Sequence, residues 1–412
     1  MKIFFICTHP NQGTGYARVA NKLTNHLASL PGVEVVYYAF QNYKGQEIKD
    51  RFIDPRIKFY DAIELDPEAP GGFGDAGIVP SIIKEKPDVL FHYNDINVVR
   101  DIMRLIPPEH MPPKKYLYLD IVYRWQNIDT FEIMKEYKFD HIWTFLDTWT
   151  RHMVDDLNFD PSKVTTMVHG VDFERFVDVP REEAKVKAGF KPDDYLVVNM
   201  NRNSSRKMWE TTIKAFLELL QRENMNPRIK LFCGGLPFCK DGVDIGMTAR
   251  TECLRRGMDS DQVVNHHIFV NPKPLHLTDA EVNNMYNAGD VGLSTTRGEG
   301  FGLTPVEHMY LNRPQIVTGI PAHRETMGPY AHFVEPKLWV RVGQVEPHDG
   351  EGALCDYKDF ADHLQYCFKN PDERPNARDY LKEKYSWDHM YKVLDEAFNI
   401  QNPHYQDYYL SN

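Results

Sequence analysis

Short apolar segments alternate with longer amphipathic stretches along most of this sequence. In the first half of the chain the apolar segments occupy residues 2–7, 33–38, 88–91, 115–119 and 142–145. Apart from Glu34 they are largely hydrophobic on both faces, which is expected of parallel strands that have helices on both sides. The alternation therefore predicts an α/β fold built on parallel sheets.

The same alternation begins again near residue 195. Further apolar segments occupy residues 195–200, 229–232, 267–270, 291–294 and 315–317, and residues 209–224 show the period of a helix. A chain of 412 residues is long enough for two domains. We therefore expect two Rossmann-like domains, in residues 1–170 and 171–385, that face each other across a cleft. From about Ser386 the sequence predicts one helix and then a polar, tyrosine-rich tail over the rest of 386–412.

Charge and composition exclude several classes of protein. The chain has 48 Lys and Arg against 59 Asp and Glu, a net charge of −11, so it has no general attraction for nucleic acid or anionic lipid. No apolar run approaches the roughly 18–20 residues that span a bilayer. Its six cysteines are scattered and form no Cys-x-x-Cys pair, which favours reduced thiols over disulfides or a zinc site. We expect a cytoplasmic protein.

Ligands of open α/β sheets bind beyond the carboxyl ends of the strands, so residues that directly follow a strand are candidates for a site. Segment 297–307, Arg-Gly-Glu-Gly-Phe-Gly-Leu-Thr-Pro-Val-Glu, follows the predicted strand at 291–294. Its three glycines allow the backbone to approach a ligand closely. Glu299 stands between two of them and has no capping role, which makes its carboxylate a candidate ligand for a substrate.

The end of this segment predicts the start of a helix. Thr304 suits the N-cap, Pro305 the first helical position and Glu307 the third, which together form a capping box. The free amides of such a helix end suit a phosphate group. Two roles stay open for Glu307. Its carboxylate either only caps the helix or accepts hydrogen bonds from vicinal hydroxyls of a sugar or ribose.

A basic loop follows the predicted strand at 195–200. Residues 201–207 read Asn-Arg-Asn-Ser-Ser-Arg-Lys, with cations at Arg202, Arg206 and Lys207. The loop is either a solvated basic turn or an anion site, and its position at a strand's carboxyl end favours the anion site. Arginine can hold phosphate oxygens bidentately, and lysine acts as a point charge.

A glycine turn, Gly13-Thr14-Gly15, follows the first predicted strand. It either caps the first helix or contacts the phosphate or sugar of the same ligand. No glycine stands three residues beyond Gly15, so the dinucleotide fingerprint is not supported. The signatures of P-loop hydrolases, zinc proteases and α/β-hydrolases are also missing from the sequence.

Taken together, these segments resemble the family 4 retaining glycosyltransferases of the GT-B fold. The resemblance covers nearly the whole chain and is strongest in the second half. Glu299 and Glu307 match the family's Glu-x7-Glu motif, and Arg202 and Lys207 match its diphosphate-binding Arg and Lys, five residues apart. Three further segments are similar to the family's crossover, site-strand lead-in and C-terminal helix, namely residues 169–172, 286–291 and 385–387.

The resemblance implies transfer of a hexose from a nucleoside diphosphate sugar, with retention at the anomeric carbon and without a metal, to a glycan or other hydroxyl acceptor. Family frequency favours GDP-mannose, with UDP-glucose next. Arg202 and Lys207 would neutralise the leaving diphosphate, Glu299 would face the sugar and Glu307 the ribose. The resemblance also implies that the C-terminal helix folds back toward the first domain. The full set of expected donor-binding residues is Gly13, Thr14, Gly15, Arg202, Lys207, Gly300, Phe301, Gly302, Leu303, Thr304 and Glu307.

The first half departs from the family at one position. Members commonly place a histidine after the strand that here ends Leu119-Asp120. Either Asp120 takes over a contact to sugar or acceptor, or the histidine comes from elsewhere, for instance His92. We count Asp120 with Glu299, Arg202 and Lys207 as the expected catalytic residues. Two other functions stay open: a nucleotide-sugar epimerase of the same fold, and a non-catalytic nucleotide-sugar binding protein.

Overall fold

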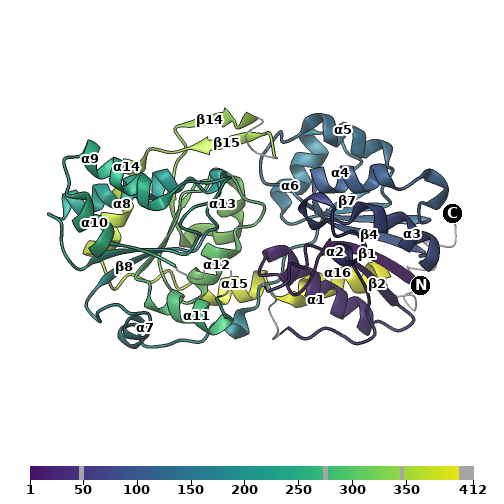
Figure 1. Cartoon of the computed structure of the whole chain (residues 1–412), viewed down its shortest axis with the longest axis horizontal. Coiled ribbons are helices and arrows are strands. Elements are labelled where there is room, and N and C mark those ends of the chain that lie inside the picture. The colour runs from purple at the N-terminus through teal and green to yellow at the C-terminus, as the bar shows by residue number, and fades with distance from the viewer. Residues whose placement is uncertain (46–50, 272–276, 344–347, 399–412) are drawn as a thin grey trace. The chain divides into compact units, whose positions relative to one another are not determined.

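The computed structural model describes residues 1–45, 51–271, 277–343 and 348–398, which form two compact units (Figure 1). Unit 1 comprises Met1–Ile121, Trp125–Gly170 and the described part of Tyr385–Asn412. Unit 2 comprises Val122–Arg124 and Val171–Lys384. Both units are built on parallel sheets, so the predicted α/β class is confirmed.

Unit 1 contains a seven-stranded sheet in the order β3-β2-β1-β4-β5-β6-β7, and every pair in it is parallel. The order changes direction at β1, as it does in doubly wound sheets. The strands are β1 Lys2–Thr8, β2 Glu34–Phe40, β3 Lys58–Asp61, β4 Val89–Asp95, β5 Lys114–Asp120, β6 His141–Thr144 and β7 Val164–Thr166.

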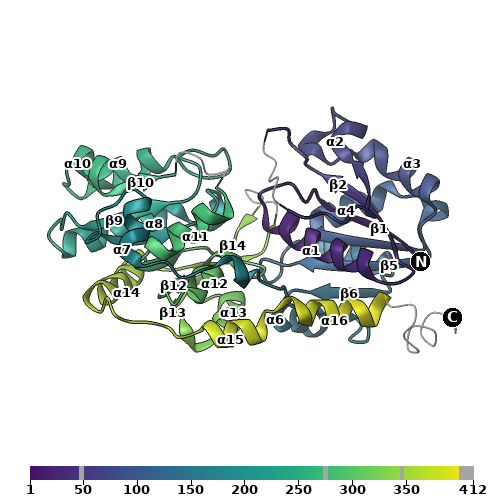
Figure 2. The same ribbon diagram turned by 90° about the horizontal axis from the view of Figure 1, so that it is seen from below.

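The helices of unit 1 include the last described helix of the chain. They are α1 Gly15–Ser29, α2 Ala62–Leu65, α3 Asp75–Glu85, α4 Ile96–Leu105, α5 Ile128–Glu136, α6 Asp147–Arg151 and α16 Trp387–Phe398. Helix α16 packs against α1 (Figure 2). His26 of α1 stacks on Tyr391 with ring centroids 4.1 Å apart, and its Nε2 lies 2.7 Å from Oδ1 of Asp395. The C-terminal helix thus returns to the first unit as expected, while the predicted tail lies outside the described residues from 399 onward.

Unit 2 contains a six-stranded sheet in the order β10-β9-β8-β11-β12-β13, again parallel throughout. A separate antiparallel pair joins β14 to β15. The strands are β8 Tyr195–Asn199, β9 Ile229–Cys233, β10 Ile268–Val270, β11 Val291–Ser294, β12 Gln315–Thr318, β13 His332–Val334, β14 Leu338–Arg341 and β15 Glu351–Leu354.

The helices of unit 2 bury the two faces of this sheet. They are α7 Arg181–Lys187, α8 Trp209–Arg222, α9 Ile245–Arg255, α10 Ser260–His266, α11 Asp279–Ala288, α12 Leu303–Tyr310, α13 Pro321–Met327, α14 Tyr357–Lys369 and α15 Arg378–Lys384. Helix α8 shows the predicted pattern, because Trp209, Ile213 and Phe216 are all fully buried in the main core. The neighbouring strands β8 and β11 lie at the centre of the sheet, and the loops that follow them therefore meet at its carboxyl edge.

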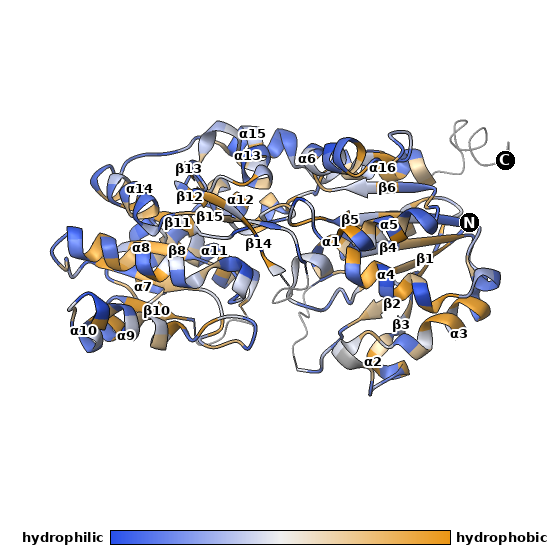
Figure 3. Ribbon diagram, turned by 90° about the horizontal axis from the view of Figure 1, so that it is seen from above, coloured by the Kyte–Doolittle hydropathy of each residue, from blue (hydrophilic) through white to orange (hydrophobic). Residues whose placement is uncertain are grey.

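Hydropathy accounts for most of this architecture. Strands such as β1 are largely hydrophobic, whereas helices such as α1 and α4 alternate between hydrophobic and hydrophilic residues (Figure 3). The sequence did not predict β3, β13 or the β14–β15 pair, which are short and only partly buried. Within the described residues no helix combines the length and the apolar character needed to cross a membrane.

Candidate functional site

The loops after β8 and β11 are joined by a set of hydrogen bonds at the carboxyl edge of the unit 2 sheet. The backbone N–H of Arg297 donates to the carbonyl of Arg206 over 3.0 Å. The hydroxyls of Thr295 and Thr296 donate to the carbonyls of Lys207 and Arg206 over 3.1 and 3.2 Å. These bonds fix the basic loop beside the glycine-rich segment, as expected for two loops that follow neighbouring parallel strands.

The joined loops bring one carboxylate between two cations. Oε2 of Glu299 lies 2.8 Å from Nη1 of Arg206, and Oε1 of Glu299 pairs with Nζ of Lys207. The side chains are well buried, with exposed fractions of 10% for Glu299, 11% for Lys207 and 21% for Arg206. We call these three residues the charged centre.

Burial and the neighbouring opposite charges shift the pKa values of the charged centre in opposite directions. Burial alone would raise the pKa of Glu299, but Lys207 and Arg206 outweigh it and hold that pKa well below its usual range. Burial lowers the pKa of Lys207 to about 8, although the Glu299 carboxylate opposes the shift. At neutral pH the centre therefore carries one negative and two positive charges.

Arg202 does not join the charged centre in this structure. Its side chain is 72% exposed, and its Nη2 lies 3.7 Å from Oδ2 of Asp241. The Arg202 side chain is exposed because its two neighbours in the sequence, Asn201 and Asn203, are buried and hydrogen-bonded inside unit 2. The sequence therefore predicted the right loop, but the structure places Arg206 rather than Arg202 beside Lys207 and Glu299.

The glycine-rich segment is tightly packed around Glu299. A Cβ atom on Gly298 would lie 2.2 Å from Cε1 of Tyr123, which belongs to unit 2 and packs with Val122 and Val342. The carbonyl of Arg297 accepts a hydrogen bond from the N–H of Ala353 in β15 over 2.9 Å. The backbone on the N-terminal side of Glu299 is thus held by two other segments of unit 2.

We expect Gly298→Ala to destabilise the protein by about 1–3 kcal/mol, the usual cost of adding a methyl group to a filled space. Gly246→Ala is the matched control, because the nearest atom to its added Cβ is Oδ1 of Asp244 at 3.5 Å, an ordinary contact. Urea denaturation of both variants measures the difference. Equal stability of the two variants would contradict the packing of Tyr123 on Gly298.

The start of helix α12 differs from the predicted capping box. The helix begins at Leu303, with Gly302 as its N-cap in the left-handed region at φ 91°, so Thr304 and Pro305 already lie within the first turn. Thr304 donates its hydroxyl to Oδ1 of Asn201 over 3.3 Å instead of capping. The box prediction was wrong because the glycine lets the chain enter the helix two residues earlier than Thr304 would. Glu307 is consequently no cap.

Glu307 instead forms a buried ion pair with a residue that the sequence analysis missed. Its Oε1 lies 3.1 Å from Nη2 of Arg175, and its Oε2 accepts a hydrogen bond from the hydroxyl of Tyr286 over 3.3 Å. Arg175 also lies 2.7 Å from Asp279 and stacks on the ring of Phe176. Burial alone would lower the pKa of Arg175, but the two carboxylates raise it. The one available signal was a lone arginine just after the predicted crossover at 169–172.

His323 at the start of α13 was also missed. Its Nδ1 lies 2.9 Å from the carbonyl oxygen of Thr318, so Nδ1 must carry the proton. Burial lowers the pKa of His323 to about 4, which leaves the ring neutral at pH 7. The ring lies against Gly302, and Nε2 has no hydrogen-bond partner among the described residues. Nε2 of His323 is thus a neutral hydrogen-bond acceptor in a ring that lies against Gly302 of the glycine-rich segment.

The candidates of the first half all lie in unit 1. The carboxylate of Asp120, at the end of β5, accepts a hydrogen bond from the hydroxyl of Tyr16 over 2.6 Å. Thr14 caps α1 by accepting from the N–H of Ala17 over 3.1 Å, and Gly13 and Gly15 beside it are exposed. His92 is fully buried in the middle of β4, where burial lowers its pKa to about 3. The roles of these residues toward a ligand stay predictions.

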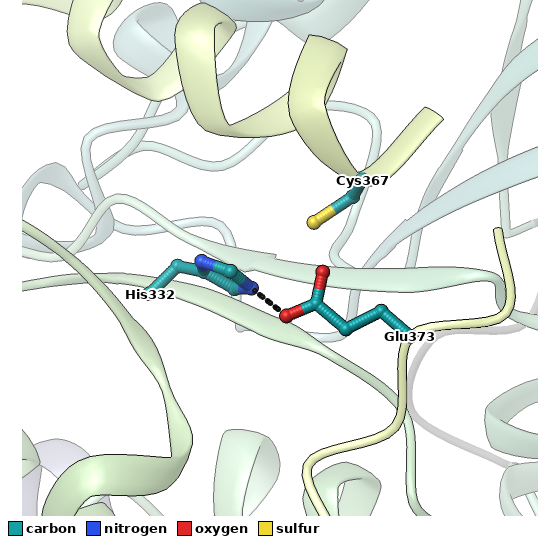
Figure 4. Close-up of side chains that lie close together, drawn as sticks. All are labelled: His332, Cys367 and Glu373. Atoms are coloured by element: carbon teal, nitrogen blue, oxygen red, sulfur yellow. Dashed lines mark ion pairs between the residues drawn. The ribbon is translucent and has the colours of Figure 1, made fainter. Parts of the chain in front are cut away.

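A second group of titratable side chains lies at the edge strand of unit 2. His332 of β13, Cys367 of α14 and Glu373 lie close together, with Nε2 of His332 3.0 Å from Oε1 of Glu373 (Figure 4). Cys367 belongs to the hydrophobic core, and burial raises the pKa of its thiol to about 12, so the thiol is protonated at neutral pH. We describe the group as an ion pair beside a buried thiol.

Comparison with known proteins shows that the charged centre lies in a segment that matches a known protein family. The sequence pattern of the family "Glycosyl transferases group 1" matches residues 180–384, which include Glu299, Lys207 and Arg206. Residues 180–384 are a glycosyl transferases group 1 domain. Arg175 lies just outside this domain, whereas its partner Glu307 lies inside it.

One relative is similar to part of this chain in sequence, and solved structures are similar to it in fold. A D-inositol 3-phosphate glycosyltransferase 2 from Catenulispora acidiphila is 25% identical over 162 residues, 39% of this chain, and the match spans about a third (36%) of that relative. Sucrose-phosphate synthase from Thermosynechococcus elongatus superposes with a TM-score of 0.69 at 13% identity, over 96% of this chain and 97% of that one. Anabaena HepE, in complex with UDP and glucose, gives 0.67 at 12% identity over 96% and 98%. At these identities the likeness shows that this chain has the same fold as the two solved structures.

Proposed function

We propose that this chain is a retaining glycosyltransferase that moves a hexose from a nucleoside diphosphate sugar to a hydroxyl of a glycan or another acceptor. The observation that carries the proposal is the charged centre, which the group 1 domain places at the carboxyl edge of its sheet. Two partly buried cations beside a carboxylate match the two parts of such a donor, because the cations suit its diphosphate and the carboxylate suits its sugar hydroxyls.

The chemistry follows from the charges. When the bond between the anomeric carbon and the diphosphate oxygen breaks, its electron pair goes to the diphosphate and positive charge develops on the sugar ring. Lys207 and Arg206 stabilise the negative charge of the departing diphosphate. Glu299, which lies beside both cations, interacts with the positive charge on the sugar ring. The acceptor hydroxyl then bonds to the anomeric carbon on the same face, and its proton passes to the departing diphosphate oxygen, which has just gained the electron pair.

Helix α12 provides a further group for the leaving diphosphate. The helix begins at Leu303 without a side-chain cap, so its first backbone amides keep their donors and the positive end of the helix dipole. The helix starts four residues after Glu299 in the same segment. We propose that these amides bind the donor phosphates, as the resemblance implied for residues 300–304.

We also propose that transfer needs no divalent metal. This proposal is supported by the two positive charges of Lys207 and Arg206, which would screen the diphosphate in place of a metal ion, and whose partial burial would strengthen that interaction. For the compartment, we propose the cytoplasm, because all six cysteines are free thiols, which suits a reducing environment.

The sugar and base of the donor are proposed from two sources. The resemblance to family 4 enzymes favours GDP-mannose, and we keep it as the first candidate. HepE, which shares the fold, is described in complex with UDP-glucose, so UDP-glucose is the second candidate. Both donors present the same diphosphate to Lys207 and Arg206.

A nucleotide-release assay tests the proposed activity. The purified chain is incubated with each donor, with and without free sugars and alcohols as acceptors, in buffer containing EDTA, and the linkage formed is analysed by proton NMR. We expect acceptor-dependent release of nucleoside diphosphate and an anomer that matches the donor. Conversion of the donor into an epimer without release would indicate the epimerase alternative, and tight binding without any reaction would indicate a binding protein.

A further inference from the structure

In this structure the carboxylate of Glu299 offsets part of the positive charge of the charged centre. Both oxygens of Glu299 are engaged, Oε2 by Arg206 at 2.8 Å and Oε1 by Lys207. Nη1 of Arg206 also donates to the carbonyl of Gly298 over 2.5 Å, which fixes the guanidinium against the backbone next to Glu299. A diphosphate that approaches these two cations therefore meets a carboxylate that is already paired with both of them.

A diphosphate and Glu299 compete for the same cations. We propose that Glu299 is a resident counter-ion, which the diphosphate of the donor displaces from Lys207 and Arg206, and that Arg206 rather than Arg202 is the second cation of the site. This inference rests on the proposed function. It assigns to Arg206 the role that the Arg/Lys pattern indicates for Arg202, and it gives Glu299 a second role besides contact with the sugar.

The exchange has a physical consequence for donor and product. When an intact donor binds, the displaced carboxylate of Glu299 can accept hydrogen bonds from the sugar hydroxyls, so its buried charge stays compensated. A free nucleoside diphosphate displaces the same carboxylate but offers no sugar to receive it. Glu299 therefore disfavours the product more than the donor, and its return to Lys207 and Arg206 helps to expel the product after transfer.

Arg206 suits this exchange better than Arg202 by its position. The Arg206 side chain is 21% exposed and already shares a carboxylate with Lys207, whereas Arg202 is 72% exposed and lies near Asp241. A partly desolvated cation binds an anion more strongly than one surrounded by water. Because Arg206 is held by its neighbours, it also loses less side-chain entropy when an anion arrives.

The test is calorimetric titration of GDP and UDP, without sugar, into the wild-type chain and the Glu299→Gln variant. Glutamine keeps the size of the side chain but removes the competing charge. We expect the nucleoside diphosphate that wild type binds to bind Glu299→Gln about tenfold more tightly or better, as expected when a buried charge pair need not be broken. The same variant should lose turnover with the intact sugar donor.

The opposite result would overturn the inference. If Glu299→Gln bound the nucleoside diphosphate as weakly as wild type or more weakly, Glu299 would be holding the cations in place rather than competing with the ligand. Thermal denaturation of the variant checks that it is folded, and Glu299→Ala repeats the test with a different side chain. If wild type binds neither GDP nor UDP, the proposed function fails first, so the two failures are distinguishable.

A matched pair of arginine variants tests the assignment of the second cation. We expect Arg206→Gln to weaken binding of the nucleoside diphosphate at least about tenfold more than Arg202→Gln does, because Arg202 is exposed to solvent. Both substitutions remove one positive charge from the same loop, so the change in net charge is identical. A larger loss in Arg202→Gln than in Arg206→Gln would assign the role to Arg202 and overturn this part of the proposal.

Discussion

Replacing Lys207 by methionine is expected to weaken binding of the nucleoside diphosphate by about two orders of magnitude at low salt. Truncating one member of a buried charge pair costs on the order of 2–5 kcal/mol, and Lys207 is as buried as its partner Glu299. Methionine keeps the unbranched apolar stem, so the loss reports on the charge. Calorimetric titration at low and high salt measures the effect.

The stability of Lys207→Met should change far less than its affinity. Burial already lowers the pKa of Lys207, so its charge is costly in the ligand-free fold, and Arg206 stays beside Glu299 in the variant. Lys207→Arg provides the pH control. Binding to wild type should weaken as pH rises through about 8, where Lys207 loses its proton, whereas the arginine variant should show no such step. Unchanged affinity in Lys207→Met would remove this residue from the site.

Replacing Arg175 by methionine is expected to produce the largest loss of stability, about 3–5 kcal/mol at neutral pH. The substitution leaves the Glu307 carboxylate buried without its cation, and removing one partner of a buried ion pair has this cost. The hydroxyl of Tyr286 alone cannot balance the charge. Urea denaturation measures the free energy of unfolding.

Two controls isolate the Arg175–Glu307 pair. The double variant Arg175→Met with Glu307→Gln should recover most of the lost stability, because no buried charge is left without a partner. Asp279→Asn should cost about 1 kcal/mol or less, because the Asp279 side chain is 64% exposed. If the double variant were less stable than Arg175→Met, the stability lost in Arg175→Met would come from the missing contact of the Arg175 guanidinium with Phe176 rather than from the unpaired charge of Glu307.

The sheets were predictable from the sequence because their strands are buried on both faces. Continuous apolar runs such as β8 and β11 differ clearly from the polar loops that follow them, and the period of α8 is that of a half-buried helix. The strands β3 and β14 escaped prediction, since each has four residues, carries charge at one end or both and is only partly covered. Short strands of this kind are formed by pairing with neighbours far away in the sequence.

The charged centre was predictable in part for the same reason. Glu299 and Lys207 each follow a strand of the sheet, so the rule for ligand sites in α/β folds selects them. The choice between Arg202 and Arg206 depends on the inward anchoring of Asn201 and Asn203, a tertiary detail that leaves no pattern in the sequence.

Other parts of the site depend on backbone conformation and on distant contacts. The capping role considered for Glu307 was wrong because Gly302 adopts a positive φ and starts α12 earlier than the Thr-Pro pair indicates. Arg175 lies 132 residues from Glu307 in the chain. His323 likewise reaches Gly302 from helix α13, which follows α12 and β12 in the chain. Local sequence rules cannot bring such residues together.

The central claim is that the charged centre binds the diphosphate of a sugar nucleotide. It is tested most directly by calorimetric titration of the wild-type chain with a panel of nucleoside diphosphate sugars that includes GDP-mannose and UDP-glucose, in EDTA and at two salt concentrations. We predict that at least one donor binds without metal, and that its affinity falls as salt increases. Failure of every member of the panel to bind would contradict the account.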